Sequence, residues 1–518
     1  MTVGPGFLGR RKRSSWIFAW ASSHLRRRPL KVTRDVHPTS ARWRARWNAF
    51  RFPINGEKQA LLRERWNSLP SELRTPNQLA GRHLTHCGFT TGASYCSFRC
   101  THCYLPANAN AVPIPSLTQI REQIDANRRF QGPGGGLQIT GGDVADAYWH
   151  SGRQDELIEI VRYAVGVGLV PMLMTHGQTL LEHPEFLEAL VIEGGLRQVA
   201  VHIDMTQAGR HGYPIARIKT EKDLHPVREA FTDLARDIRE RIGAPLELAH
   251  NCTVTERNIA SVPDVVRWFL ADPGRSRIWR ILSFQPEANT GRTLFSQTPV
   301  TPADVWQKIC DGMGLKLDGS AYIGGHPDCN QGTTLLVERR RGRYLPLLPN
   351  DEKTKGLFAE ILTTLGAIST ITTDAGAGAS LLPYRVAGAF ARHPELALRS
   401  LARVLALVAS GRIPLPFLHA IATGRAQTIN IGTHNFMDAS QVAKAADNPV
   451  TLARLDACVF KGAVKDRATG KWEAVPMCSM NQAGWNELYA ERLSESQPAL
   501  IPSRHNAAKD LTNYFGGR

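Results

Sequence analysis

The sequence predicts an α/β fold in which strands and helices alternate and the strands gather into a parallel sheet or barrel. Between residues 116 and 285, short apolar segments of strand length are separated by longer segments of helical character. The connections between them are short, which is typical of βα units. With 518 residues the chain exceeds one ordinary domain, so we expect further segments on both sides of this region.

The expected elements are six strands with helices between them. The first strand should lie directly before Cys96, and the second, at residues 135–143, ends in two glycines and an aspartate. Further strands are expected at 169–175, 198–204, 246–255 and 279–285, and helices at 116–129, 154–167, 184–192, 224–242 and 262–271. In a parallel barrel the active site gathers at the C-terminal ends of the strands, so residues there are candidates for chemistry.

Three cysteines follow the first expected strand with the spacing C-x3-C-x2-C. They are Cys96, Cys100 and Cys103, and the aromatic Tyr104 comes directly after them. Thiolates are the usual ligands of iron–sulfur clusters, and three of them leave one iron of a 4Fe-4S cube without a protein ligand. The alternatives are buried cysteines or a structural zinc site. Zinc prefers four ligands in paired C-x2-C units, and only Cys100 and Cys103 form such a pair here.

This motif resembles the cluster loop of the radical S-adenosylmethionine (SAM) enzymes. The resemblance implies a partial (β/α)6 radical SAM barrel over about residues 83–292 and a 4Fe-4S cluster on Cys96, Cys100 and Cys103. It also implies that SAM binds the open iron, with Tyr104 beside the cofactor. In that family an electron from an external donor, such as a flavodoxin or ferredoxin, cleaves SAM. The resulting 5'-deoxyadenosyl radical then abstracts a hydrogen from the substrate.

Several predicted strand ends resemble SAM-binding positions of the same family. Gly141-Gly142-Asp143 resembles the Gly-Gly-Glu segment whose backbone and carboxylate hold the SAM ammonium group, with aspartate one methylene shorter. Asp204, Thr253 and Gln285 resemble positions near SAM or substrate at the ends of the fourth, fifth and sixth strands. The alternatives are an ordinary turn for the glycine segment and hydrogen-bonded rim residues for the other three.

Three further cysteines lie in short motifs of the C-terminal part: Cys329 ends His-Pro-Asp-Cys, Cys458 follows Arg-Leu-Asp-Ala, and Cys478 precedes Ser-Met-Asn. Together with Asn-Phe-Met-Asp at 435–438, these motifs resemble the C-terminal half of archaeal tetraether lipid synthases, which are similar to the class D radical SAM methylases. The resemblance implies an auxiliary 4Fe-4S cluster on these cysteines and carbon–carbon bond formation or alkylation on a lipid. The alternative is three buried core thiols. Cys87 and Cys310 are candidates for a fourth ligand.

The composition of the chain limits the classes of partner that it is expected to bind. A formal net charge of +17 and a pI near 9.7 favour anionic partners, yet no specific nucleic-acid-binding motif is present, and anionic lipid head groups are attracted by the same charge. Nine cysteines do not suggest a disulfide scaffold in so long a chain. No apolar run reaches bilayer-spanning length, so we expect a cytoplasmic protein. The basic segment 10–28 is either a disordered tail or a contact with the membrane surface.

Five segments are expected along the chain. They are a basic extension at 1–82, the radical SAM partial barrel at 83–296, a connecting segment at 297–345, a helical apolar insertion at 346–428 and an auxiliary-cluster-like domain at 429–518. Within the insertion, the apolar residues of 395–410 cover more than one narrow helical stripe. This helix should therefore form the core of a helical subdomain or the wall of a site for a long alkyl chain.

These observations favour a radical SAM enzyme that acts on a lipid or other long apolar substrate. Within the same class, the alternatives are a methylase and a peptide-modifying enzyme. From another class, a metal-binding protein that interacts with RNA and performs no radical chemistry would also use clustered cysteines. That last alternative leaves the βα units and the Gly-Gly-Asp segment unexplained.

Overall fold

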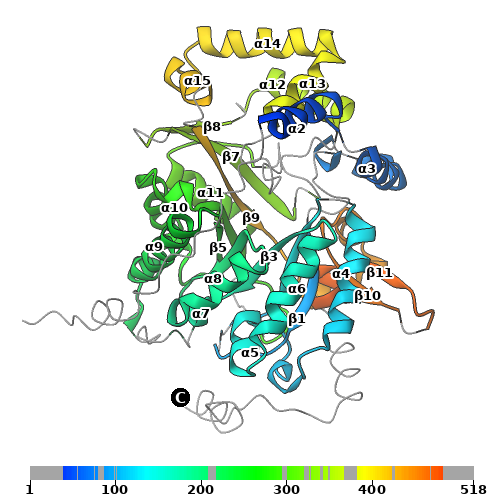
Figure 1. Cartoon of the computed structure of the whole chain (residues 1–518), viewed down its shortest axis with the longest axis vertical. Helices are drawn as coiled ribbons and strands as arrows, with labels where there is room; N and C mark the ends of the chain where they lie inside the picture. The colour runs from blue at the N-terminus through cyan, green and yellow to red at the C-terminus, as the bar shows by residue number, and fades with distance from the viewer. Residues whose placement is uncertain are drawn as a thin grey trace, which may run out of the picture.

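The computed structural model describes residues 39–481, apart from gaps at 55, 75, 80–86, 99, 101, 133, 208–209, 211–216, 294–299, 320–325, 327, 339–341, 348–349, 367–381, 423–425 and 467. Eleven strands form one sheet in the order β11-β10-β1-β2-β3-β4-β5-β6-β9-β7-β8 (Figure 1). The strands are β1 (Cys87–Ala93), β2 (Gly136–Gly141), β3 (Val170–Thr175), β4 (Gln198–His202), β5 (Glu247–Val254), β6 (Trp279–Pro286), β7 (Asn330–Glu338), β8 (Tyr344–Pro346), β9 (Ala426–His434), β10 (Phe460–Lys465) and β11 (Trp472–Pro476).

The centre of the sheet consists of the six strands that the sequence predicts. Strands β1 to β6 are neighbours in chain order, and every adjacent pair among them is parallel. Each of these strands after the first lies within two residues of its expected ends. The prediction of an α/β fold with a mostly parallel sheet is therefore confirmed.

Helices connect the parallel strands and pack against them. They are α4 (Leu117–Gln131), α5 (Val144–His150), α6 (Gln154–Gly166), α7 (Gln178–Glu182), α8 (Pro184–Ile192), α9 (His225–Ile242), α10 (Val262–Ala271) and α11 (Pro302–Met313). Local signals set their ends: α4 starts with a capping box between Ser116 and Gln119, and α9 stops at Gly243, whose φ is +74°. The expected helices are all present, whereas α5, α7 and α11 were not predicted.

The C-terminal strands extend both edges of this sheet. β9 runs parallel to β6, and β10 runs parallel to β1. β7 and β8 continue antiparallel beyond β9, and β11 pairs antiparallel with β10. Residues expected to form a separate C-terminal domain thus share the sheet of the predicted barrel region, and the expected boundary after residue 428 falls inside β9. The short helices α16 (Ala439–Ala443), α17 (Pro449–Asp456) and α18 (Met477–Ser479) lie between and after these strands.

A group of helices, here called the helical cap, lies beyond one end of the sheet (Figure 1). It comprises α2 (Thr39–Arg51), α12 (Glu352–Leu365), α13 (Leu382–Ala391), α14 (Pro394–Ala409) and α15 (Leu415–Ala422), and α3 (Gly56–Ser68) is its neighbour in sequence. The expectation that α14 is a subdomain core is wrong for most of the helix, because only Leu396 and Leu407 of it are buried. Among the described residues, none of the helices is long and apolar enough to cross a bilayer.

Candidate functional site

The cysteine loop follows the C-terminal end of β1 and is held at several points. The Asn110 side chain accepts a hydrogen bond from the Cys96 amide at 3.1 Å and donates one to the Cys96 carbonyl at 3.0 Å. The Ser97 amide donates to Asp146 Oδ2 at 2.8 Å, and Cys100 forms an isolated β-bridge with Gln207. The loop is thereby fixed to the ends of β2 and β4, and all three of its cysteines line one cavity.

The environment of Cys96 and Cys100 disfavours the ionisation of their thiols. Burial raises the pKa of Cys96 and Cys100 well above the ordinary range of a thiol, and the neighbouring loop cysteines raise it further. The buried Arg210 and the half-buried Arg292 oppose this effect, because both lower the pKa of Cys100. Cysteine binds a metal as the thiolate, so the binding of a cation at this loop would release protons from these thiols.

Residues 287–293 clamp the loop from the side of β6. The Arg292 amide donates to the Cys103 carbonyl at 2.9 Å, and its Nη2 donates to Cys103 Sγ at 3.2 Å. His102 Nδ1 lies 2.6 Å from Glu287 Oε2, so this imidazole nitrogen is directed at the carboxylate. Gly291 has φ +61°, and a Cβ there would lie 2.1 Å from the Tyr104 carbonyl oxygen.

We expect Gly291→Ala to destabilise the protein by about 1 to 3 kcal/mol more than Gly152→Ala, because the added methyl group collides with the loop backbone. Gly152 is a matched control: its φ is +70°, but a Cβ there would meet nothing within 4 Å. Urea unfolding measures the difference, and faster reaction of the loop thiols with a thiol reagent should accompany it. Equal losses in the two variants would show that the clamp does not constrain the loop.

The Gly141-Gly142-Asp143 turn packs directly under the start of the cysteine loop. The Gly142 amide donates to the Ala93 carbonyl at 2.7 Å, and a Cβ at Gly142 would lie 2.2 Å from the Tyr95 carbonyl oxygen. Tyr104 donates its hydroxyl hydrogen to the Gly141 carbonyl at 2.8 Å. The predicted loop, turn and Tyr104 are thus brought together at one end of the cavity.

The Asp143 carboxylate has partners that the sequence did not reveal. It accepts hydrogen bonds from the Asp146 amide at 2.9 Å, from Thr175 Oγ1 at 2.7 Å and from the His176 amide at 2.6 Å. It therefore caps α5 and ties β2 to β3, and the residue is 1% exposed. The ammonium-binding role expected for Asp143 would have to compete with these three donors, although Gly141, Gly142 and Asp143 all line the cavity.

His176 and Asp146 form a buried polar pair beneath the cysteine loop. His176 Nδ1 accepts from the Gln178 amide at 3.1 Å, which places the ring hydrogen on Nε2, 3.2 Å from Asp143 Oδ2. Phe98 of the loop stacks on the His176 ring at 3.6 Å. Burial alone would raise the pKa of Asp146, but hydrogen bonds from His176 and Ser97 lower it to about 2. In the sequence, only the position of His176 directly after the third expected strand indicates that it could belong to the site.

The other predicted strand-end residues have different roles. Thr253 and Gln285 line the cavity and are register partners at the ends of β5 and β6. Asp204 is fully buried and is not among the cavity-lining residues. Its carboxylate accepts from the Thr253 amide at 2.8 Å and lies 2.6 Å from His202 Nε2, so it orients His202, which the sequence analysis missed. Burial alone would raise the pKa of Asp204, but His202 holds it well below its usual range.

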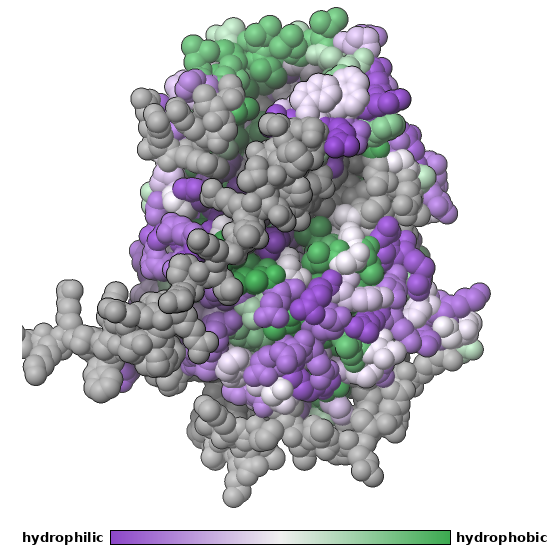
Figure 2. Space-filling view, viewed as in Figure 1, coloured by the Kyte–Doolittle hydropathy of each residue, from purple (hydrophilic) through white to green (hydrophobic). Residues whose placement is uncertain are grey.

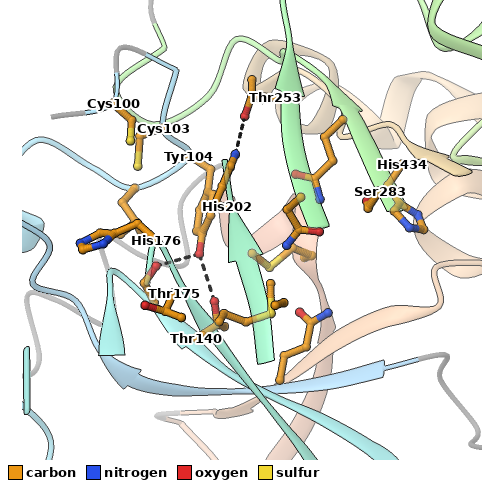
Figure 3. A pocket seen from close by; sticks show the side chains of 18 of the residues that line it. Cys100, Cys103, Tyr104, Thr140, Thr175, His176, His202, Thr253, Ser283 and His434 are labelled. Atoms are coloured by element: carbon orange, nitrogen blue, oxygen red, sulfur yellow. Dashed lines mark hydrogen bonds between the residues drawn. The ribbon is translucent and has the colours of Figure 1, made fainter. Parts of the chain in front are cut away.

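The cavity runs along one face of the sheet and has a volume of about 290 Å³. Alternate residues of the strands β2 to β6 face it, as the pleat of a strand requires. These residues are Gly136, Gln138 and Thr140 of β2, Val170, Met172 and Met174 of β3, Gln198, Ala200 and His202 of β4, Ala249, Asn251 and Thr253 of β5, and Ile281, Ser283 and Gln285 of β6. Figure 3 shows Cys100 and Cys103 on one side of this cavity and Ser283 and His434 on the other.

The three C-terminal cysteines also meet. Cys329, Cys458 and Cys478 line one small cavity of about 30 Å³, although they are far apart in the sequence. Arg454 Nε donates to Cys329 Sγ at 3.3 Å, and the Met437 amide donates to Cys478 Sγ at 3.4 Å. Burial and the neighbouring Cys458 raise the pKa of Cys478 to about 12. Cys310 lines neither cavity, and the Cys87 side chain lies outside the described residues.

The two cavities share a wall. His434, Phe436, Phe460 and Met477 line both of them. The His434 ring packs edge-on against Phe460 at 4.9 Å, and its Nδ1 lies 2.6 Å from Asn330 Oδ1. One layer of side chains therefore separates the C-terminal thiols from the cavity of the cysteine loop.

Comparison with known proteins adds no assignment. No protein-family model matches the chain, and no curated protein matches it. In the described part of the chain, no three His, Cys, Asp or Glu side chains are grouped as ligands of a single metal ion would be. A four-iron cube binds its ligands at separate corners, so its thiolates need not converge on one point.

Proposed function

We propose that this protein is a radical SAM enzyme. The observation that carries the proposal is the meeting of Cys96, Cys100 and Cys103, at the C-terminal end of β1, with the Gly141-Gly142 turn at one end of the cavity. The parallel order of β1 to β6 and the single face that lines the cavity with alternate residues support a partial barrel. A cavity of about 290 Å³ is near the lower end of the usual range for small-molecule sites.

The donor set fits a 4Fe-4S cluster. Three soft sulfur ligands on one loop suit iron–sulfur binding, and Arg292 and Arg210 offset part of the negative charge that three thiolates create. When bound there with SAM, the cluster supplies the electron that cleaves SAM to the 5'-deoxyadenosyl radical. Cys96, Cys100 and Cys103 would hold it, Tyr104 and Arg292 fix the loop, and the glycine turn lines the cavity where SAM would bind.

The lining of the cavity favours an apolar substrate. Val170, Met172, Met174 and Ile281 line it, together with the polar Gln138 and Gln198, which are both register partners of Met172. The polar side chains of His202 and Thr253 face it at the C-terminal ends of the strands. A ligand with a polar end near the thiols and a longer, mostly apolar part would match this lining. We therefore propose a lipid or other long apolar molecule as the substrate class.

The proposal is tested by anaerobic reconstitution of the full chain with iron and sulfide, followed by incubation with SAM and a low-potential reductant. We expect 5'-deoxyadenosine to form, and deuterium to transfer into it from perdeuterated lipids but not from deuterated peptides. Deuterium transfer from a peptide would favour the peptide-modifying alternative. Tight RNA binding without any 5'-deoxyadenosine would favour the non-catalytic alternative.

We also propose that Cys329, Cys458 and Cys478 bind an auxiliary 4Fe-4S cluster. Their convergence and the Arg454 contact support this proposal. The volume of the cavity between them is about the volume that one water molecule occupies in the liquid. The surrounding side chains must therefore move apart before a cluster can enter. Iron counting therefore discriminates well between a cluster site and three core thiols.

We expect about eight irons per reconstituted chain, and about four in the Cys458→Ala, Cys478→Ala double variant, because each cube contains four irons. The matched control is Cys252→Ala with Cys310→Ala, which removes two buried thiols that line neither cavity. Chemical iron and sulfide analysis gives the numbers. About four irons in the unmodified chain would mean that the three C-terminal cysteines are structural.

A further inference from the structure

The outward face of α14 is apolar from Leu398 to Ala409. Leu398, Leu401 and Leu405 are 67%, 55% and 58% exposed, and Val404 is exposed beside them. Pro394, Ala402 and Ala409 occupy further positions on the same face, and the exposed Glu395 lies beside it in the first turn of the helix. A surface helix of a monomer ordinarily turns such a face inward, and a contiguous exposed apolar patch marks an interaction site.

Helix α15 extends this patch. Leu415 and Ile421 are 67% and 50% exposed, and Figure 2 shows the hydrophobic surface gathered at the end of the molecule where Figure 1 places α14. The patch is defined here by Leu398, Leu401, Val404, Leu405, Leu415 and Ile421. The patch is exposed because Leu396 and Leu407 are the only buried residues of α14, while Arg399 and Arg403 pair with Glu360 and Asp351 of the segment that carries α12.

The helical cap that carries the patch is basic. Residues 39–51, 351–366 and 382–422 contain eleven basic side chains, Arg42, Arg44, Arg46, Arg51, Lys353, Lys355, Arg385, Arg392, Arg399, Arg403 and Arg412, and four acidic ones, Asp351, Glu352, Glu360 and Glu395. The Arg399 and Arg412 side chains remain 48% and 57% exposed, although both are paired with carboxylates. A positive field around an apolar patch complements an anionic lipid surface, whereas a second copy of the same cap would be repelled.

The helical cap lies at the end of the cavity away from the cysteine loop. α15 directly precedes β9, and β9 is parallel to β6, so the cap is on the side of the strands' N-terminal ends. The cysteine loop follows the opposite, C-terminal end of β1. The cavity extends along this distance, because Gly136, Val170 and Gln198, the first residues of β2, β3 and β4, also line it.

We propose that the patch on α14 and α15 docks the protein on the surface of an anionic lipid bilayer. The apolar side chains enter the boundary between head groups and acyl chains, and the surrounding arginines contact the head groups. Docking by this face places the bilayer at the end of the molecule opposite the cysteine loop. The docking surface does not depend on which reaction the cavity performs.

The test is flotation of the full chain with vesicles of phosphatidylcholine alone or with added phosphatidylglycerol. We expect binding to the anionic vesicles, weaker binding at high salt, and little binding to phosphatidylcholine. Leu398→Glu with Leu405→Glu should weaken binding at least about thirtyfold, because two inserted side chains are lost and two like charges face the lipid. Every variant retains residues 1–38, so the comparison reports on the patch and not on the basic N-terminal segment.

The matched control is Val450→Glu with Leu452→Glu on α17, which makes the same charge change at residues that are 58% and 46% exposed and lie outside the patch. We expect this control to bind vesicles about as tightly as the unmodified chain, apart from the general effect of its charge. Equal weakening in the two double variants would overturn the proposal. So would a chain that ignores anionic vesicles but forms a dimer that only the α14 variant dissociates, since the patch would then be an interface between copies.

Discussion

Replacing Cys96, Cys100 and Cys103 together with alanine is expected to abolish the formation of 5'-deoxyadenosine from SAM. The three thiols are held at one end of the cavity by backbone hydrogen bonds and by Arg292, and no other described cysteine lies on that loop. Loss of the thiolates removes the ligands of the proposed cluster outright, so activity should fall to background. Iron should fall by about four per chain but remain at the auxiliary site.

The controls for this prediction separate cluster loss from unfolding. Cys252→Ala with Cys310→Ala removes two buried thiols away from the loop and should leave 5'-deoxyadenosine formation intact. Near-ultraviolet circular dichroism of the triple variant should retain the tertiary signal, because the sheet core lies elsewhere. Unchanged 5'-deoxyadenosine in the triple variant would end the radical SAM proposal.

The fold was predictable where its signals are local. Each of the strands β2 to β6 is a short apolar run next to a helix with its own start or stop signal, such as Ser116 before α4 and Gly243 after α9. The pairing of β9 with β6 and of β10 with β1 was not predictable in this way. Ile281 and Asn430 are register partners but lie far apart in the sequence, so no local pattern encodes their contact.

The site, like the fold, has features that could be predicted from the sequence and features that could not. The cysteine loop, the glycine turn and Tyr104 lie together because each follows the end of a parallel strand, a rule that can be applied to sequence alone. The rule does not state which way a side chain points. Asp204 and Asp143 both follow strands, yet backbone amides and hydroxyl groups draw their carboxylates into the protein, and neighbouring His202 and His176 take positions that the sequence analysis had left unassigned.

A buried ion pair behind β4 and β5 supports this arrangement. Arg228 of α9 is fully buried and donates to Glu221 Oε2 at 2.6 Å, to the Ile203 carbonyl at 3.2 Å and to His250 Nε2 at 3.1 Å. Glu221 in turn accepts from the Met205 amide at 2.9 Å and from Asn258 Nδ2 at 2.9 Å. Burial lowers the pKa of His250 far below its ordinary value, and Arg228 lowers it further, so His250 stays neutral and accepts.

Arg228→Met is expected to destabilise the protein by about 3 to 5 kcal/mol, because it leaves Glu221 buried without its counter-charge. This loss is a large fraction of the usual stability of a folded protein. The control is Arg236→Met on the same helix, which removes an exposed pair with Asp233 and should cost less than about 1 kcal/mol. Urea unfolding measures both variants.

Adding Glu221→Gln to Arg228→Met should recover part of the lost stability, because the buried unpaired charge is then absent while the side-chain oxygen still accepts from the Met205 amide. If Arg228 and Glu221 stabilised the protein only through packing, the double variant would recover no stability. Equal losses of stability for Arg228→Met and Arg236→Met would contradict the role assigned to the network. The residues that the network braces, Ile203 and Met205, flank Asp204, which orients His202 at the cavity. Recovery of stability in the double variant should therefore be accompanied by recovery of the His202 environment, measured by NMR of labelled histidine.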